Sequence, residues 1–351
     1  MLEEKLTIVS LFSGAGGLDI AACSSGRVGT LLSTDSNPVF LQTVVDNLPC
    51  HFPDVTHRHI VADARDLSGD TIIKKLGSPR VDIVIGGPPC DDFTPYGRKK
   101  GATGDKAPLI FEFVRMVGEL KPRAFLFENV PNLTRQFKDY WQKLLEAFPD
   151  EYQPVSWAVL AAKNFGAPTV RERVFSVGFR KSSDREAFEF PSPTHGEAKG
   201  QLPLPGLKNT LIPYVTVGKV LADVPELTDQ NATLFHNHEG RKHRPQTIEH
   251  LKTVPQGVHT RKSFRYRAPW DGLCHSLTAG LDNGTKSYIH PTYHREMSVR
   301  EYARIHGFPD TWVFSGNHHN GIKQVANSVP IPLGLAVFDS VISAIKDPGI
   351  F

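Results

Sequence analysis

The chain has 351 residues, enough for one large domain and a second, smaller one. Hydrophobic residues make up 40% of it and charged residues 22%, which is ordinary for a globular protein, and the net charge is only +3. Any nucleic-acid role must therefore come from local basic clusters. The charged N-terminus argues against a signal peptide. The chain has no apolar run of roughly 18 residues, which argues against a membrane span.

The first predicted unit is a strand, a glycine turn and the start of a helix. Residues 6–11 are apolar and rich in β-formers, and Phe12-Ser13-Gly14-Ala15-Gly16-Gly17 leads from them into a helix that starts at Leu18. Such a turn lets backbone amides approach a nucleotide-like ligand. A lone glycine turn is weak evidence, so a cofactor site here depends on the motifs that follow.

Two further predicted strands end in acids. The strand over residues 31–34 ends at Asp35, which is placed to accept hydrogen bonds from ribose hydroxyls or to cap the helix that begins near Pro38. The strand over residues 60–62 ends at Asp63, which either meets an exocyclic amine or caps the next turn. Both interpretations of each acid stay open at this point.

An apolar run, Val81 to Ile85, ends in Gly86-Gly87-Pro88-Pro89 and delivers Cys90. A basic loop, Gly97-Arg98-Lys99-Lys100-Gly101, follows it. A thiol at the end of a strand beside a cationic loop suits a nucleophile that acts on a polyanion, and a buried core cysteine is the alternative. The other cysteines form no Cys-x-x-Cys pair, which argues against a disulfide framework or a cysteine zinc site and fits a reducing compartment: Cys23, Cys50 and Cys274.

An amphipathic helix over residues 109–120 precedes a short buried strand, 124–127, that ends in Glu128. A carboxylate after four apolar residues is costly unless it is used or paired. Strands over 158–160 and 174–179 flank Arg171-Glu172-Arg173. The alternation predicts a doubly wound α/β sheet with ligands at the carboxyl ends of its strands. Five candidate residues fall at such ends, which indicates one shared site: Gly14, Asp35, Asp63, Cys90 and Glu128.

After residue 179 the chain becomes rich in Pro, Gly, Asn, His and Thr, which predicts a second, irregular and partly β domain. Within residues 241–267, eight basic residues face a single acid, Glu249: Arg241, Lys242, Arg244, Lys252, Arg261, Lys262, Arg265 and Arg267. Such a cluster is typical of a surface that contacts a phosphate backbone, and a solvated basic face is the alternative. Three histidines nearby lack zinc-site spacing, so no metal is expected: His236, His238 and His243.

The C-terminal part again predicts regular helices. Ser298 with Glu301 three residues later predicts a capping box for a helix that runs to His306. Gly307-Phe308-Pro309-Asp310 ends that helix, and Asn327-Ser328-Val329-Pro330 leads into a final apolar helix over 333–345.

Taken in order, these motifs resemble those of the DNA (cytosine-5)-methyltransferases over nearly the whole chain. The motifs that carry the resemblance are residues 12–17, 86–90 with Phe93, 128–130, 171–175, 288–291, 300–301, 307–310 and 327–329. The resemblance implies a Rossmann-like, doubly wound class I S-adenosylmethionine-dependent methyltransferase sheet formed by residues 1–185 and 322–351. It also implies a target-recognition domain over 186–295 and a hinge over 296–321.

The resemblance further implies methyl transfer from S-adenosylmethionine to C5 of a flipped-out cytosine in duplex DNA. Cys90 would add to C6, Glu128 would meet N3, Arg173 would hold O2, and Arg171 would support the site or a phosphate. Cofactor contacts would come from Phe12, Gly14, Ala15, Gly16, Gly17, Leu18, Asp35, Asp63, Ala64, Pro88, Asn327, Ser328 and Val329. DNA contacts would come from Arg98, Lys99, Lys100, Arg241, Arg261, Lys262 and Arg265, and residues 97–106 would form a lid. A monomer in the prokaryotic cytoplasm, with a cognate restriction endonuclease as a candidate partner, fits this family.

The sequence departs from the family pattern at several positions. The family usually reads Cys-Gln-x-Phe-Ser, where this chain has Cys90-Asp91-Asp92-Phe93-Thr94, and two acids beside a DNA phosphate are unexpected. Other departures are Asp35 for Glu, Ser36 for an aromatic residue, Thr169 for Gln and Ala326 for Gly. None removes a group that the chemistry needs. Thr94 resembles the tRNA branch of the family, so a tRNA cytosine-5 methyltransferase and a catalytically inactive DNA-binding subunit are the alternatives.

Overall fold

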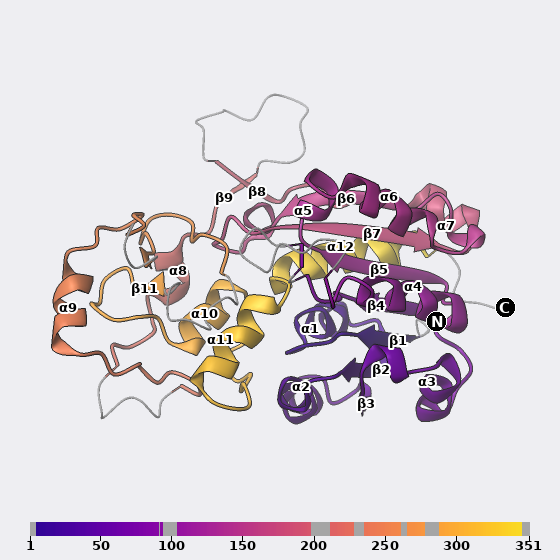
Figure 1. Cartoon of the computed structure of the whole chain (residues 1–351), viewed down its shortest axis with the longest axis horizontal. Coiled ribbons are helices and arrows are strands. Elements are labelled where there is room, and N and C mark those ends of the chain that lie inside the picture. Colours follow the sequence, from indigo (N-terminus) through magenta and orange to yellow (C-terminus); the bar gives the residue numbers. More distant parts are fainter. Residues whose placement is uncertain are drawn as a thin grey trace. The chain divides into compact units, whose positions relative to one another are not determined.

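A computed structural model describes residues 5–90, 92–93, 104–197, 211–227, 235–260, 265–277 and 288–345. The chain divides into two compact units (Figure 1). The first unit comprises Met1–Leu160, Glu172–Pro191 and Gly334–Phe351, and the second comprises Ala161–Arg171 and Ser192–Leu333. The functional boundaries predicted from the sequence at residues 185, 295 and 322 remain predictions.

One sheet of seven strands organises the first unit, in the order β3-β2-β1-β4-β5-β7-β6. Strands β1 to β5 pair in parallel, whereas β7 runs antiparallel to β5. The strands are β1 (Leu6–Leu11), β2 (Val28–Asp35), β3 (Thr56–Val61), β4 (Ile83–Gly86), β5 (Ala124–Asn129), β6 (Ser156–Ala161) and β7 (Glu172–Phe179). The order reverses direction between β1 and β4, so the glycine turn after β1 and the cysteine loop after β4 begin at the topological switch point.

The predicted doubly wound α/β sheet is confirmed, but the antiparallel strand was not predicted. Residues 162–171, which join β6 to β7, are too few for the crossover of a dozen or more residues that a parallel neighbour needs. The helices that connect the other strands are α1 (Gly17–Ser24), α2 (Pro38–His51), α3 (Gly69–Leu76), α4 (Leu109–Leu120), α5 (Asn132–Arg135) and α6 (Lys138–Glu146). The remaining helices are α7 (Ser182–Ala187), η1 (Ala64–Asp66), η3 (Asp150–Tyr152) and η4 (Ala162–Phe165).

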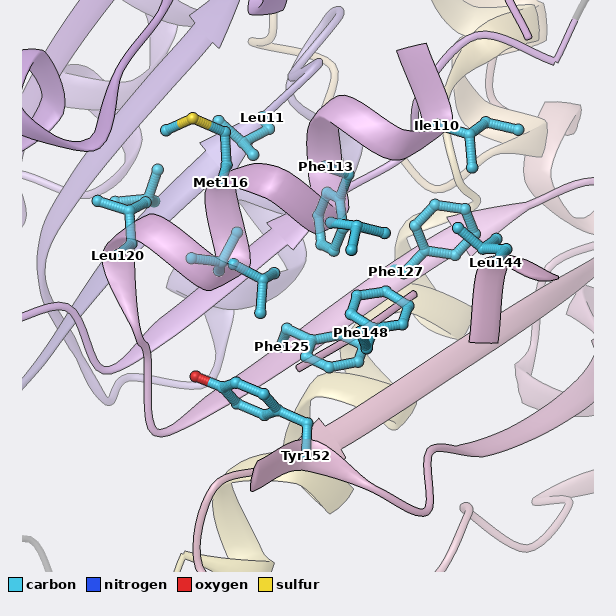
Figure 2. Packing of buried hydrophobic residues seen from close by; sticks show 14 of the residues in the cluster. Leu11, Ile110, Phe113, Met116, Leu120, Phe125, Phe127, Leu144, Phe148 and Tyr152 are labelled. Atoms are coloured by element: carbon cyan, nitrogen blue, oxygen red, sulfur yellow. The ribbon is translucent and has the colours of Figure 1, made fainter. Parts of the chain in front are cut away.

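An aromatic core holds α4 against the middle of the sheet (Figure 2). The rings of Phe125 and Phe148 stack with centroids 4.1 Å apart, and Phe113 meets Phe127 edge-on at 5.3 Å. Offset and edge-on aromatic pairs add about 0.5–1.5 kcal/mol each beyond the area they bury. This core fixes β4 and β5 directly below the point where Cys90 and Glu128 emerge.

A buried polar cluster lies under the glycine turn. The carboxylate of Asp19 on α1 accepts hydrogen bonds from Ser10 Oγ at 2.9 Å and Ser33 Oγ at 2.5 Å. Ser13, within the turn, donates to Ser10 Oγ at 2.9 Å. Burial raises the pKa of Asp19 to about 6, because desolvation disfavours the charged carboxylate more than the two serines favour it.

Asp19→Asn should therefore change how stability depends on pH. A pKa that is higher in the folded state means that the folded chain binds more protons, so this stabilising contribution is present below about pH 4 and is lost as pH rises through 6. A shift of about two pKa units corresponds to about 3 kcal/mol. In urea unfolding at pH 4 and pH 7.5, the parent should lose up to about 3 kcal/mol relative to Asp19→Asn as pH rises. Parallel pH dependences would contradict this expectation.

The second unit is irregular with short paired strands, as predicted. Its strands are β8 (His195–Gly196) with β9 (Ile212–Pro213) and β10 (Tyr266–Arg267) with β11 (Tyr288–Ile289). Its helices are α8 (Val217–Leu221), α9 (Pro245–Lys252), α10 (Val299–Ile305) and α11 (His318–Asn327), and α12 (Ile331–Ala344) leads back to the first unit.

Buried arginines donate hydrogen bonds to backbone carbonyls of this unit, because the short strands described in it leave many carbonyls without a partner in a sheet. Arg267 donates to the carbonyls of Leu251, Val254 and His290, each at 2.6 Å. Arg267 counts toward the basic cluster in the sequence, but it is buried and has a structural role.

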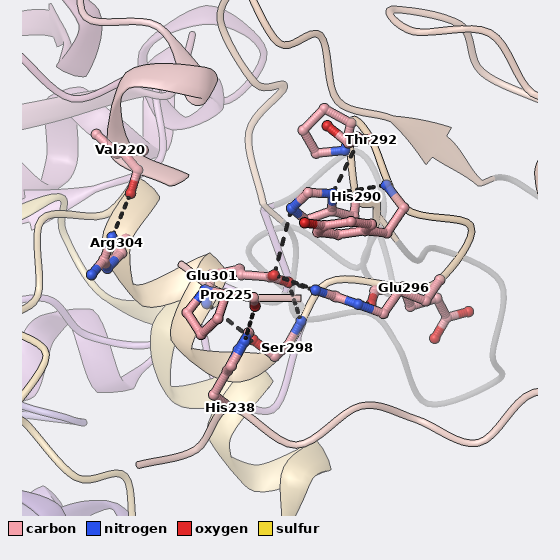
Figure 3. A network of polar contacts seen from close by, with 12 residues as sticks. Val220, Pro225, His238, His290, Thr292, Glu296, Ser298, Glu301 and Arg304 are labelled. Atoms are coloured by element: carbon pink, nitrogen blue, oxygen red, sulfur yellow. Dashed lines mark hydrogen bonds and ion pairs between the residues drawn. The ribbon is translucent and has the colours of Figure 1, made fainter. Parts of the chain in front are cut away.

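The predicted capping box of α10 is confirmed, with the side chains of Ser298 and Glu301 each bonded to the other's backbone. Figure 3 shows the surrounding network, in which His238 bonds Ser298 Oγ at 2.7 Å and Glu301 pairs with Arg295 at 2.6 Å.

Within the described residues, one helical stretch, His318–Ala344, is long and apolar enough to cross a membrane by length and composition. Core helices pass the same test, and 67% of its most apolar window is buried.

Candidate active site

The cysteine loop lies against the end of β5. A methyl group on Gly86 would come within 2.5 Å of the Leu11 carbonyl oxygen, and one on Gly87 within 2.6 Å of Glu128 Oε2. The Asn129 side chain donates to the Pro88 carbonyl at 3.1 Å. Backbone approach therefore requires glycine at Gly86, a side chain at Gly87 would displace the Glu128 carboxylate, and the loop that ends in Cys90 is anchored beside Glu128.

Glu128 and Arg173 form a buried ion pair. Arg173 Nε lies 2.7 Å from Glu128 Oε1, and the two residues are 9% and 6% exposed. The sheet explains the contact, because Glu128 is registered with Phe175 on antiparallel β7, which makes Arg173 its diagonal neighbour on the same face. Arg173 Nη1 also donates to its neighbour's carbonyl, Glu172 O, at 2.7 Å. One carboxylate oxygen thus meets the guanidinium while the other faces the cysteine loop.

Cys90 differs from the other three cysteines in its surroundings. It is partly exposed at the end of the loop, whereas Cys23 and Cys274 are buried, and burial raises the pKa of both of those thiols far above its usual range. Cys50 is exposed on α2, where its sulfur lies 3.7 Å from the Asp46 carbonyl. Cys90 is thus the cysteine that follows the strand end next to Glu128.

Asp92 does not present its charge to solvent. It is 3% exposed, and its Oδ2 accepts from the backbone amides of Lys106 at 2.8 Å and Ala107 at 3.1 Å. The concern that this acid would face a DNA phosphate is removed, because the carboxylate points at the turn before α4. Asp91 lies outside the described residues.

Three residues of the glycine turn have a left-handed backbone. Phe12 and Gly14 have φ +56° and Gly16 has φ +83°, in the left-handed region where glycine is favoured. A methyl group on Gly14 would meet nothing within 4 Å, so the turn is open on that side. The next cofactor candidates are buried in the turn and the start of α1: Ala15, Gly16, Gly17 and Leu18.

Asp35 braces this turn from β2. Its Oδ2 accepts from the Gly14 amide at 2.8 Å and its Oδ1 accepts from the Asn37 amide at 2.8 Å. Burial raises the pKa of Asp35. The helix-cap interpretation of Asp35 is wrong, because Asn37 caps α2.

Asp63 follows β3 and caps η1, where it accepts from the Arg65 amide at 3.0 Å. Hydrogen bonds from Arg65 lower the pKa of Asp63 to about 2. The capping role is confirmed, and Ala64 lies buried in the same turn.

Four of the predicted catalytic and cofactor residues belong to the second unit: Arg171, Asn327, Ser328 and Val329. Arg171 is buried and donates to the carbonyls of Leu277 and Ala326, each at 2.6 Å. Ala326 directly precedes the motif that consists of Asn327, Ser328 and Val329, in which Ser328 Oγ donates to the Gln324 carbonyl at 2.8 Å. Arg171 therefore holds the backbone that carries this motif.

The predicted DNA contacts lie only partly within the described residues, which exclude Arg98, Lys99, Lys100, Arg261 and Lys262. The guanidinium groups of Arg241 and Arg265 both lie 3.5 Å from the carboxylate of buried Glu296. Glu296, Asn129 and Asp92 were missed as candidates. The sequence offered a reason to consider two of them, because Asn129 follows Glu128 directly and Asp92 lies two residues after Cys90. It offered none for Glu296.

Among solved structures, the fold is similar to a DNA modification methyltransferase encoded within a prophage of E. coli. The TM-score is 0.75 at 23% identity, over 98% of this chain and 100% of that one. It is also similar to Spodoptera frugiperda DNMT2, with a TM-score of 0.60 at 15% identity over 96% and 100% of the two chains. With the mostly parallel seven-stranded sheet, these likenesses define a Rossmann-like methyltransferase fold.

Residues 6–343 match the C-5 cytosine-specific DNA methylase family. Type II methyltransferase M1.HphI of Haemophilus parahaemolyticus is 30% identical over 355 residues, covering 96% of this chain and 87% of the relative. Type II methyltransferase M.SacI of Streptomyces achromogenes is 29% identical over 385 residues, covering 96% and 92%. The chain belongs to the C-5 cytosine-specific DNA methylase family and is a DNA (cytosine-5)-methyltransferase.

Proposed function

We propose that this protein transfers a methyl group to C5 of a cytosine flipped out of duplex DNA, through a covalent bond between Cys90 and C6. The observation that supports this most directly is the position of Glu128. Its carboxylate is held by Arg173 on one side and lies against Gly87 on the other, three residues before Cys90. A nucleophile and an acid are thereby anchored at the ends of adjacent strands.

Cys90 would supply the activation that C5 lacks. A thiolate that adds to C6 turns the C5–C6 double bond into an enamine-like nucleophile centred on C5. An ordinary thiol with a pKa of about 8.5 is only a few per cent ionised at pH 7, but thiolates are intrinsically strong nucleophiles. Since C6 is stacked inside a duplex, the cytosine must leave the stack to be reached.

Glu128 and Arg173 would stabilise the base during addition. Glu128 would hydrogen-bond N3 and share a proton with it, which offsets the charge that develops as the thiolate adds. Arg173, fixed by Glu128 and by the Glu172 carbonyl, would hold O2. After methylation, a water molecule accepts the C5 proton, the C5–C6 double bond re-forms, and the bond between C6 and Cys90 breaks to release the thiolate. Arg171 would act indirectly, through the backbone beside Asn327.

The glycine turn would hold the methyl donor, S-adenosylmethionine, which when bound supplies an electrophilic methyl group. The residues fit such a ligand, because the space beside Gly14 is open and Asp35 holds the turn through the Gly14 amide. Phe12, Asp35, Asp63 and Pro88 stand at the ends of four parallel strands or in the loops after them, where ligands of this fold class bind. Asn327, Ser328 and Val329 stay predicted contacts of the donor on the basis of the sequence motif.

Asp35→Ala should weaken binding of S-adenosylmethionine by about ten- to a hundredfold. Removing a charged hydrogen-bond partner costs about 1.5–3 kcal/mol, and here the Gly14 amide also loses its acceptor. Calorimetric titration with S-adenosylmethionine measures the change. Ser68→Ala, which removes the N-cap of α3, serves as a control of similar structural cost. An unchanged affinity in Asp35→Ala would restrict Asp35 to bracing the turn.

Duplex DNA is the proposed substrate because the similar relatives are named Type II methyltransferases, a name that also suggests a cognate restriction endonuclease as a functional partner. The exposed Arg241 would contact phosphates in this proposal. Transfer of labelled methyl groups to duplex DNA and to tRNA separates the two substrates, and bisulfite sequencing of DNA from cells that express the chain identifies the site. Transfer to tRNA alone, or to neither, would refute the proposal.

A further inference from the structure

The chain makes a tight turn immediately after Cys90. The Phe93 amide donates to the Cys90 carbonyl at 2.9 Å, so the backbone at Phe93 is bonded directly to the backbone at Cys90. The ring of Phe93 is buried between Phe137 at 5.2 Å and Tyr140 at 4.9 Å. Its carbonyl accepts from Asn132 Nδ2 at 2.6 Å. One end of the turn is therefore held by α5 and α6.

Asp92, inside this turn, joins it to a distant part of the backbone. Its Oδ2 accepts from the amides of Lys106 and Ala107, and the Ala107 carbonyl accepts from Tyr140 Oη at 2.6 Å. Tyr140 thus contacts Phe93, which follows Asp92, and also Ala107, whose amide bonds Asp92. The carboxylate connects the residue two positions after Cys90 to the backbone that starts α4.

The hydrogen bonds from the Lys106 and Ala107 amides restrain the position of the Asp92 carboxylate. Hydrogen bonds from backbone amides to an ionised carboxylate are shorter and about twice as strong as neutral ones. The nearby N-terminus of α4 adds a favourable partial charge. A buried carboxylate is costly without such partners, so its geometry is closely determined by them.

We propose that Asp92 is a positioning residue for thiol addition, and that its carboxylate holds the Cys90 turn in register with Glu128. This inference rests on the proposed role of Cys90 as nucleophile. Asp92 itself would touch neither substrate nor cofactor. A displacement of about 1 Å in a reacting group can cost on the order of 10²-fold in rate, so loss of the restraint should slow the addition step.

Gly104 provides an independent test of the same contact. A methyl group on Gly104 would overlap the Asp92 carboxylate, and the backbone of Gly104 lies outside the left-handed region, so Asp92 is the obstacle to a side chain there. Gly104→Ala should therefore be harmful in the parent chain and tolerated when Asp92 is already alanine. Such non-additivity identifies direct coupling between neighbours.

The experiment measures the single-turnover rate of covalent adduct formation with duplex DNA that carries 5-fluorocytosine, at saturating DNA and S-adenosylmethionine. Asp92→Ala and Gly104→Ala should each be slower by about 10- to 100-fold, with unchanged affinity for S-adenosylmethionine. Asp92→Asn should recover to within about threefold of the parent, because an amide oxygen accepts the same hydrogen bonds. Asp92→Ala/Gly104→Ala should be no slower than Asp92→Ala.

Ser68→Ala, which also removes a side-chain acceptor of a backbone amide, should react at the parental rate. An adduct rate in Asp92→Ala equal to that of Ser68→Ala would reduce Asp92 to a stabilising contact and overturn the inference. Additive effects of Asp92→Ala and Gly104→Ala would overturn it as well. If Asp92→Ala does not fold, Asp92→Asn and Gly104→Ala carry the comparison, and equal rates in both would refute it. Absence of any adduct in the parent chain would instead refute the role of Cys90, and this inference with it.

Discussion

Cys90→Ala is expected to abolish methyl transfer while DNA binding is retained. Removing a catalytic nucleophile typically costs at least about 10⁴-fold in turnover, because the neighbouring groups have no covalent step left to assist. DNA affinity should change little, since phosphate contacts depend on basic residues elsewhere in the chain. Transfer of labelled methyl groups and equilibrium DNA binding measure the two quantities. Cys50→Ala, which alters an exposed thiol on α2, should keep parental activity.

Covalent trapping on DNA that contains 5-fluorocytosine tests directly whether Cys90 is the nucleophile. When fluorine replaces hydrogen at C5 of the target cytosine, the last elimination should fail, because fluorine does not leave as a cation. The parent should then form a denaturant-stable adduct with DNA that requires S-adenosylmethionine, and the linked peptide should contain Cys90. Cys90→Ala should form none. Linkage to Cys23, Cys50 or Cys274, or full activity of Cys90→Ala, would exclude Cys90 as the nucleophile.

Glu128→Gln is expected to slow methyl transfer by about 10²-fold or more. Glutamine has nearly the same shape and can donate a hydrogen bond to N3, but it cannot transfer a proton, and loss of an acid–base group costs on this scale. The variant also replaces the buried charge beside Arg173 with a neutral amide.

The informative measurement for Glu128→Gln is the single-turnover rate at saturating substrate and donor. Affinity for S-adenosylmethionine should stay near the parental value, because the donor is proposed to bind at the glycine turn. Glu146→Gln provides the matched control, since Glu146 bonds Gln142 on the exposed side of α6. A Glu128→Gln rate within a few-fold of the parent would remove Glu128 from the chemistry.

Local patterns in the sequence located five strands of the main sheet and the helix α4. The amphipathic repeat predicted a helix over residues 109–120, and α4 has those bounds. Apolar runs of β-formers marked β1, β2, β4, β5 and β7, although β5 continues through Asn129, because its pairing with β7 extends past the apolar residues. Glycine and acidic residues at strand ends indicated one shared site, because the carboxyl ends of parallel strands meet at the same edge of a sheet.

The sequence by itself determined the class of fold and the identity of the main chemical groups, because hydrophobic period, turn residues and motif order are properties of short segments. The tertiary structure alone decided the partners of those groups. Asp35 braces Gly14 where a helix cap had been considered, Arg171 binds two carbonyls, and Asp92 bonds the backbone before α4. Each of these contacts joins segments that are distant in the chain, and the choice depends on strand register and burial, which no local pattern encodes.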